Sequence, residues 1–223
     1  MNLALFDLDG TLIPKDSDHA FGEFAITLGW ADAATFRRRN DGFYEDYLTG
    51  RLDIAAYVDF ATSPWRGRSD AELQRAIERF LEIVVKPMLY PRAMALVQRH
   101  RQAGDLVAVV TATNDFITRP IARLFGVDEL IATNLERDTG GRVTGRIDGA
   151  AAFREGKITR VHAWLASRGQ ALADFDHSTF YSDSTNDLPL LQCVSSPVAT
   201  NPSRDLERIA LERGWPVLKL FSP

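Results

Sequence analysis

The chain has 223 residues, of which 45% are hydrophobic and 25% are charged, the composition of an ordinary globular protein. It holds 26 basic and 30 acidic residues, so its net charge of −4 gives no electrostatic case for binding nucleic acid or an anionic membrane. The first residues lack the basic and apolar segments of a secretory signal, and no stretch is apolar for the length of a membrane helix. A single cysteine, Cys193, excludes an internal disulfide, and we expect it to be a small core residue of a cytoplasmic protein.

The first predicted element is a strand at residues 3–6, whose four apolar residues lead directly into Asp7 and Asp9. Such a short apolar run is typical of a central strand in a parallel sheet, where ligands bind beyond the carboxyl ends of the strands. One residue separates the two aspartates in an extended segment, so their side chains leave it on the same side. Their repulsion favours a bound cation of the magnesium type, and an acidic turn closed by Gly10 and Thr11 is the simpler alternative.

Residues 16–88 have a helical and aromatic-rich pattern without a convincing strand. Apolar residues recur at helical spacing over residues 21–28, 43–48 and 73–81, and Ser69 is suited to be the N-cap of the third helix. We expect a small helical unit inserted after the first strand, in which most aromatic side chains pack in the interior.

Helices and strands alternate in the rest of the chain. Helices are predicted near residues 92–103, 115–125, 157–168 and 204–213, strands at 106–110, 130–132, 180–182, 197–200 and 217–221, and a β-hairpin at 135–147. This alternation predicts an α/β protein with a Rossmann-like, doubly wound parallel sheet. Residues 1–15 and 89–223 would form the catalytic core, and residues 16–88 an inserted helical cap.

Polar residues follow three of the predicted strands. Asp7 and Asp9 follow the first, Thr111 the second, and Asp183 and Asp187 a later one, while Lys157 opens a helix that can reach the same place. Because the carboxyl ends of parallel strands share one edge of a sheet, we expect these side chains to meet. Taken singly, each has a simpler explanation as a turn residue, a solvated lysine or a carboxylate at a helix N-terminus.

Four segments, in order, resemble the motifs of the haloacid dehalogenase-like hydrolase superfamily: the DxDGT start, the strand that ends in Thr111, the isolated Lys157 and the DSTND segment at residues 183–187. The resemblance covers nearly the whole chain. It implies a magnesium-dependent phosphomonoesterase that works through an aspartyl phosphate, with Asp7 as nucleophile and Asp9 as general acid and base.

The same resemblance assigns the surroundings of the phosphate and the metal. It places Thr111, Lys157 and Gly10 around the phosphate, with Lys157 neutralising charge during catalysis. It implies that Mg²⁺ is held by Asp7, the carbonyl of Asp9 and Asp183, and that Asp187 is an outer or alternate ligand.

The helical insertion after the first motif is similar to that of the branch that includes phosphoserine phosphatase. In that branch a cap carboxylate holds the substrate amine, a role that Asp16 or Asp18 can fill here. The arginine that holds the serine carboxylate falls on Ala61, and Arg66 and Arg68 are its nearest replacements. A buried carboxylate without a cationic partner is costly, so the missing arginine argues against phosphoserine.

A cationic phosphomonoester fits this pattern better, and similar small bacterial members of the branch are often histidinol-phosphate phosphatases. Phe43 or Tyr47 can stack on an imidazole, and Asn114 and Asn186 are further candidate substrate contacts. Phosphoserine hydrolysis and transfer of the phosphoryl group to another acceptor are the alternatives. A catalytically silent binding module is disfavoured because the nucleophile and acid/base positions are both intact. We expect a small-molecule substrate, no nucleic acid and no membrane partner, with the oligomeric state left open.

Overall fold

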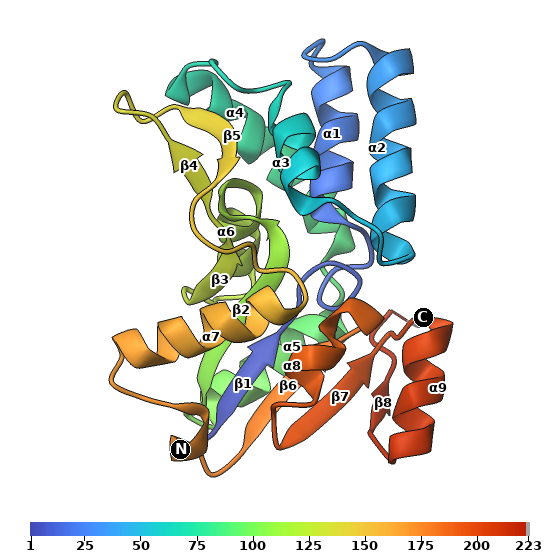
Figure 1. The fold of residues 1–223 in the computed structure, drawn as a ribbon, viewed down its shortest axis with the longest axis vertical. Coiled ribbons are helices and arrows are strands. Elements are labelled where there is room, and N and C mark those ends of the chain that lie inside the picture. Colours follow the sequence, from blue (N-terminus) through green and yellow to red (C-terminus); the bar gives the residue numbers. More distant parts are fainter. Residues whose placement is uncertain (222–223) are drawn as a thin grey trace.

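The computed structural model describes residues 1–221 and is built around a six-stranded sheet in the order β3-β2-β1-β6-β7-β8 (Figure 1). The strands are β1 (Leu3–Phe6), β2 (Leu106–Asn114), β3 (Leu130–Thr133), β6 (Ser178–Ser182), β7 (Ser196–Thr200) and β8 (Val217–Leu218). Neighbouring strands of this sheet run parallel, and β1 lies between β2 and β6. Because the strand order reverses at β1, its carboxyl end is a place where ligands bind in such sheets. The predicted doubly wound, Rossmann-like α/β fold is confirmed.

Helices cover both faces of the sheet. They are α5 (Pro91–Gln102), α6 (Asp115–Leu124), α7 (Glu155–Ser167), α8 (Leu188–Leu191) and α9 (Arg204–Arg213). Alternate residues of β1 enter two separate cores, Phe6 with apolar residues of α5 and α6, and Leu5 with apolar residues of α7, α8 and α9. The continuous apolar run of β1 is explained by this burial on both faces, since both side chains are fully buried.

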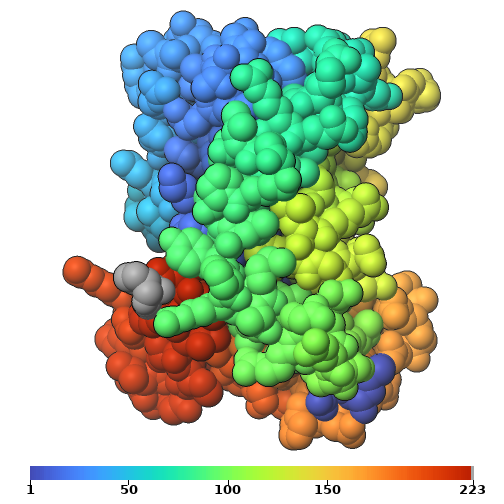
Figure 2. All heavy atoms as spheres, turned by 180° about the vertical axis from the view of Figure 1, so that it is seen from behind, coloured from blue at the N-terminus to red at the C-terminus, as the bar shows by residue number. Residues whose placement is uncertain are grey.

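The segment inserted after β1 forms four helices that lie beyond the carboxyl ends of the strands (Figure 1). They are α1 (Ser17–Thr27), α2 (Ala33–Leu48), α3 (Ile54–Thr62) and α4 (Asp70–Phe80), followed by a π-helical turn at Leu81–Val85 and a 3-10 turn at Lys86–Met88. The predicted N-cap Ser69 is confirmed and forms a complete capping box with Glu72. In the view from behind, the green segment that includes α5 joins these blue and cyan helices to the lower part of the molecule (Figure 2).

The predicted hairpin at residues 135–147 is confirmed as β4 (Leu135–Arg137) and β5 (Val143–Ile147), which pair antiparallel. It stands beside α3 and α4 (Figure 1), and Arg66 Nη1 donates a hydrogen bond to its Thr144 carbonyl at 3.1 Å. A division into a core and a cap of residues 16–88 is still our proposal, and it assigns to the core a hairpin that packs against cap helices.

Three sequence predictions differ from the structure. The strand predicted at residues 217–221 ends at Leu218 as β8, and the Leu220 amide donates to Asn201 Oδ1 at 2.6 Å instead of to a neighbouring strand. Strand β2 runs to Asn114 instead of ending at Val110, because its polar residues stay extended while the register against β3 shifts between Val110 and Asn114. Cys193 is exposed, so its assignment to the core was wrong. Helix α8 ends at Leu191, and the turn after it directs Leu191 and Val194 to the interior and leaves Cys193 outside. No helix within residues 1–221 is sufficiently long and apolar to span a membrane.

Candidate active site

A buried ion-pair cluster lies at the carboxyl ends of β1 and β6. Lys157, in the first turn of α7, donates from Nζ to Asp7 Oδ1 at 2.8 Å and to Asp187 Oδ2 at 2.7 Å. The same Asp187 oxygen accepts from Ser182 Oγ at 2.7 Å. The Lys157 side chain is only 2% exposed, so a single ammonium group fixes two carboxylates in a site that water scarcely enters.

Asp183, which follows β6, is linked to Asp7 by Thr11 in the loop after β1. Thr11 Oγ1 lies 3.3 Å from Asp7 Oδ2 and 3.1 Å from Asp183 Oδ1, and so holds the two carboxylates side by side. Gly10 has φ +78°, and a Cβ there would overlap with the Asp183 carboxylate. Asn201 donates to the carbonyl groups of Gly10 and Thr11 at 3.3 and 3.1 Å, which fixes the loop from the other side.

The charges of this cluster do not balance. Asp7, Asp183 and Asp187 lie close together, and among the described residues the ammonium group that bonds to this cluster is that of Lys157, which reaches Asp7 and Asp187. Burial raises the pKa of Asp7 to about 6 although Lys157 acts in the opposite direction, and burial, with Asp7 and Asp187, raises the pKa of Asp183 well above its usual range. A divalent cation between Asp7 and Asp183 would relieve this repulsion, so the residues fit a magnesium ion.

The ion would need ligands other than acidic side chains. Within residues 1–221, no group of three His, Cys, Asp or Glu side chains is arranged to bind a metal ion by itself. Asp187 is engaged by Lys157 and Ser182, which suits an outer position better than direct coordination. Asp7, Asp183, the Asp9 carbonyl and water would therefore supply the oxygen ligands.

Asp9 has a different environment from Asp7. Its Oδ1 accepts from the Ser17 amide and its Oδ2 from Thr113 Oγ1, each at 2.8 Å. Burial raises the pKa of Asp9 well above its usual range, and the nearby carboxylates of Asp16 and Asp7 add to the effect. A carboxyl group whose pKa is raised is suited to act as a general acid.

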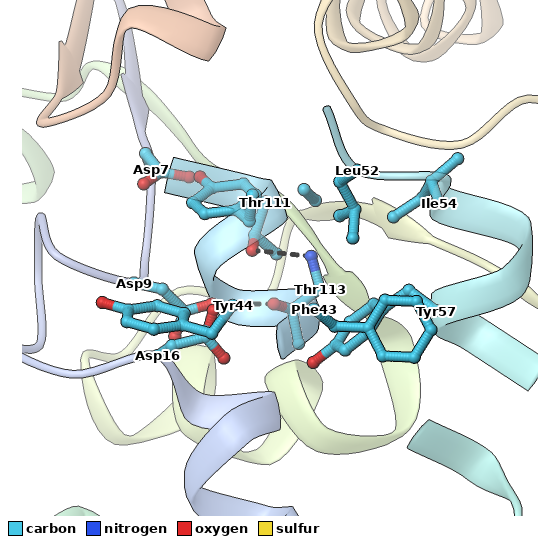
Figure 3. Close-up of a pocket in the computed structure, with 12 residues that line it drawn as sticks. Asp7, Asp9, Asp16, Phe43, Tyr44, Leu52, Ile54, Tyr57, Thr111 and Thr113 are labelled. Atoms are coloured by element: carbon cyan, nitrogen blue, oxygen red, sulfur yellow. Dashed lines mark hydrogen bonds between the residues drawn. The ribbon is translucent and has the colours of Figure 1, made fainter. Parts of the chain in front are cut away.

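A small pocket, partly open to solvent, adjoins Asp7 and Asp9 (Figure 3). It is lined by Asp7, Asp9, Asp16, Phe43, Tyr44, Tyr47, Leu52, Ile54, Tyr57, Thr111, Ala112 and Thr113. The aromatic rings come from α2 and α3, whereas the carboxylates come from the loop after β1 and the threonines from β2. Among these described lining residues there is no lysine or arginine, so the pocket is acidic and aromatic.

The structure separates the two carboxylates predicted to meet a substrate amine. Asp16 lines the pocket, whereas Asp18 is 4% exposed and accepts from Asn114 Nδ2 at 3.2 Å. Burial, reinforced by Asp16, raises the pKa of Asp18 to about 7, and the Tyr57 hydroxyl also bonds to this carboxyl group. Asn114 in turn caps α6, its Oδ1 accepting from the Ile117 amide. Asp18 and Asn114 thus bind each other and support Tyr57.

The proposed replacements for the missing arginine lie elsewhere. Arg66 pairs with Asp59 at 2.8 Å, and Arg68 stacks over the ring of Trp30 at 4.0 Å from its centroid. Neither belongs to the described lining of the pocket. Neither arginine therefore takes the place, in this pocket, of the carboxylate-binding arginine whose position falls on Ala61.

Asn186 also lies outside the pocket lining. Its Nδ2 donates to the Tyr47 carbonyl at 3.0 Å, and its Oδ1 accepts from Arg154 Nε at 3.4 Å. It therefore connects the turn after β6 with the end of α2.

Sequence reasoning missed several residues that hold this site together. Thr11 was recognised only as part of the first motif, although its place after Gly10 is a signal that it borders the carboxylates. Thr113 and Ser182, at the ends of β2 and β6, had the same signal as Thr111. No signal pointed to Asn201, because only the folded chain brings it to Gly10.

Comparison with known proteins places these features in context. A family model described as haloacid dehalogenase-like hydrolase matches residues 4–192. A protein of Neisseria meningitidis serogroup C named histidinol-phosphatase is 47% identical over 217 residues, which cover 97% of this chain and 98% of that protein. A protein of Mycobacterium tuberculosis named phosphoserine phosphatase SerB1 is 31% identical over 224 residues, covering 96% of this chain and 69% of that protein.

Two solved structures are also similar. A protein of unknown function from Bordetella pertussis Tohama I matches with a TM-score of 0.93 at 50% identity, over 99% of both chains. A substrate-bound phosphoserine phosphatase has a TM-score of 0.68 at 18% identity, over 97% of this chain and 91% of that one. The second likeness shows the fold alone.

Proposed function

We propose that this chain, which belongs to the haloacid dehalogenase-like hydrolase family and is a phosphoric monoester hydrolase, removes the phosphate of histidinol phosphate with magnesium as its cofactor. The observation that carries the choice of substrate is the acidic, aromatic pocket beside Asp7, in which Asp16 is present and no described lining residue is basic. The relative named histidinol-phosphatase, at 47% identity, supports the same choice. A cytoplasmic location stays a prediction from the sequence.

The pocket suits a substrate that carries positive charge but no carboxylate. Asp16 can pair with the amine, and Phe43, Tyr44 and Tyr57 offer ring faces to an imidazole. A cation over an aromatic face gains about 0.5–2 kcal/mol. Phosphoserine would bring a carboxylate that finds no cation among the described lining residues, and leaving a charge unpaired away from water is costly.

The chemistry follows from the two aspartates. An Asp7 carboxylate oxygen attacks phosphorus, the bond to the substrate alkoxide breaks, and Asp9 gives that alkoxide its proton, which leaves an aspartyl phosphate. Asp9 then takes a proton from a water molecule that attacks the same phosphorus, so that inorganic phosphate is released and Asp7 is regenerated. In this proposal Lys157, which bonds to Asp7, and Thr111, which lines the pocket, would meet phosphoryl oxygens. Magnesium, held by Asp7, Asp183 and the Asp9 carbonyl, would supply further neutralisation of charge.

The test is phosphate release from histidinol phosphate and phosphoserine in parallel, with and without magnesium. We expect a strong preference for histidinol phosphate and dependence on the metal. The Asp7→Asn variant is the blank, because it keeps the shape of the side chain and removes the nucleophile. Comparable turnover of the two substrates would contradict the proposed specificity, and magnesium-dependent turnover by Asp7→Asn at the wild-type rate would contradict the mechanism. An added alcohol separates hydrolysis from phosphoryl transfer, because transfer would give the phosphate ester of that alcohol and hydrolysis gives inorganic phosphate.

A further inference from the structure

Arg154, the residue before α7, has an unusual backbone. Its φ and ψ are 53° and −122°, a region that favours glycine and that few L-residues adopt. The turn is tight, because a Cβ at the following Gly156 would overlap with the Ala151 carbonyl. Strained residues of this kind persist only where their surroundings hold them, and they cluster at functional sites. This turn begins the helix that carries Lys157.

The strained turn sends the Arg154 side chain across to the cap. Its Nη2 donates to the carbonyl of Gly50, in the loop between α2 and α3. Its Nε donates to Asn186 Oδ1 at 3.4 Å. Gly50 has φ +70°, a conformation that favours glycine, and a Cβ there would lie 2.6 Å from Arg154 Nη2, so the end of the arginine side chain would have to shift.

Asn186 adds a second link between the same two parts of the chain. Its Nδ2 donates to the carbonyl of Tyr47 at 3.0 Å, near the end of α2. The ring of Tyr47 lines the pocket. On its other side, Asn186 is next in sequence to Asp187, which holds Lys157 at 2.7 Å. Arg154 and Asn186 therefore connect the buried ion-pair cluster with the aromatic wall of the pocket, that is, its lining residues Phe43, Tyr44, Tyr47 and Tyr57.

We propose that Arg154 is a positioning residue that fastens the α2–α3 loop to the turn carrying Asp187. It sets the aromatic wall at a working distance from Asp7 and Lys157 without touching the substrate, since it is not among the described residues that line the pocket. The inference rests on the placement of the active site proposed above. It does not depend on which phosphomonoester is the natural substrate.

The expected cost of losing this link is catalytic. A misplacement of about 1 Å between groups that must act together lowers a rate by roughly 100-fold. We expect kcat/KM of Arg154→Gly to fall by about 10- to 100-fold, measured per mole of folded protein. Its melting temperature should stay at the wild-type value or rise, because glycine relieves the backbone strain at this position. An arginine with a merely structural role would instead lower activity only in step with the folded fraction.

The experiment compares three variants with the wild type on p-nitrophenyl phosphate and on histidinol phosphate. Arg154→Gly removes the side chain, and Gly50→Ala keeps the arginine but displaces the end of its side chain and strains the loop backbone at the same point. Arg51→Gly is the matched control, since Arg51 lies in the same loop with a side chain 67% exposed and, within residues 1–221, pairs only with Asp46 at 3.3 Å. Millimolar guanidinium ion is added to each, because it can occupy the space left by the Arg154 side chain.

We expect guanidinium ion to restore part of the kcat/KM lost by Arg154→Gly and to leave Gly50→Ala and Arg51→Gly unchanged. Wild-type kcat/KM in Arg154→Gly would overturn the inference, as would a loss that guanidinium ion does not reduce. If the wild type fails to hydrolyse histidinol phosphate, the proposed substrate is wrong. The comparison of variants on p-nitrophenyl phosphate still decides the role of Arg154.

Discussion

Replacing Lys157 with methionine should destabilise the protein strongly and in a pH-dependent way. Methionine fills nearly the same volume, so the change removes the charge without leaving a large cavity. In the wild type, Lys157 Nζ donates to Asp7 and Asp187 at 2.8 and 2.7 Å, and the three side chains are between 2% and 5% exposed. Breaking a buried ion pair by removing one partner costs about 3–5 kcal/mol, because the other charges stay buried.

The pH dependence follows from the Asp7 carboxyl group. Its pKa is already raised by burial to about 6, and Lys157 acts to lower it, so the variant should raise it further. The folded variant then binds more protons than the unfolded chain above the ordinary pKa of an aspartate. By linkage, its stability falls as the pH rises through this range. Because the wild-type Asp7 carboxyl itself loses its proton near pH 6, the loss relative to the wild type should grow only above about pH 6, and Asp7 should add up to about 1.4 kcal/mol to it at pH 7.

The assay is urea unfolding of both proteins at pH 4, 5, 6 and 7, with a chelator present so that no divalent cation binds the carboxylates. Lys219→Met is the matched control. Lys219 pairs with Glu207 at 3.0 Å, but these side chains are 46% and 39% exposed, and exposed pairs contribute about 0–1 kcal/mol. A loss below about 1 kcal/mol at pH 7 for Lys157→Met, or one that does not change with pH, would refute this account of the cluster.

Three further outcomes are expected. Gly10→Ala should raise the magnesium concentration needed for half-maximal activity by about 10-fold or more, because the added methyl overlaps with the Asp183 carboxylate; an unchanged magnesium titration would contradict this. Asp18→Asn should be more stable than the wild type at pH 8 by up to about 4 kcal/mol, and equal to it near pH 4, in urea unfolding, because each unit of the raised pKa corresponds to about 1.4 kcal/mol. The sign follows because a carboxyl whose pKa is raised to about 7 loses its stabilising contribution as pH rises through that value. Arg66→Ala and Arg68→Ala should leave the ratio of kcat/KM for histidinol phosphate and phosphoserine unchanged, and a shift toward histidinol phosphate in either variant would mean that the arginine binds a substrate carboxylate.

Features encoded in short stretches of sequence were predictable. The run at Leu3–Phe6 predicted a strand buried on both faces, and Ser69 before an apolar helical pattern predicted a helix start, to which the structure adds Glu72 as the second half of a capping box. The approach of Lys157 to Asp7 followed from a general property of parallel sheets, whose strands end at one edge. In each case the residues that form the sequence pattern are also the ones whose burial, hydrogen bonding or position at a strand end produces the structure.

Features that depend on which side chains meet in space were not predictable. Asp16 and Asp18 are two residues apart, yet only the first lines the pocket, because the second turns inward to Asn114. Cys193 is exposed although it stands in an apolar stretch, because the short helix before it directs Leu190 and Leu191 into the core and the chain then turns. Arg66 pairs with Asp59 and lies outside the described lining of the pocket, a position that no spacing reveals.

The central position of β1 also has a consequence for synthesis of the protein on the ribosome. The strand that carries Asp7 is made first, but one of its two neighbours is β6, at Ser178–Ser182. At about 5–20 residues per second, roughly 10 to 35 s pass between the two. During this time β1 has an unpaired edge, which is a site for wrong pairing or for a chaperone. Only when β6 has emerged can Asp183 reach Asp7, so a nascent chain has no complete catalytic centre until most of its length has been translated.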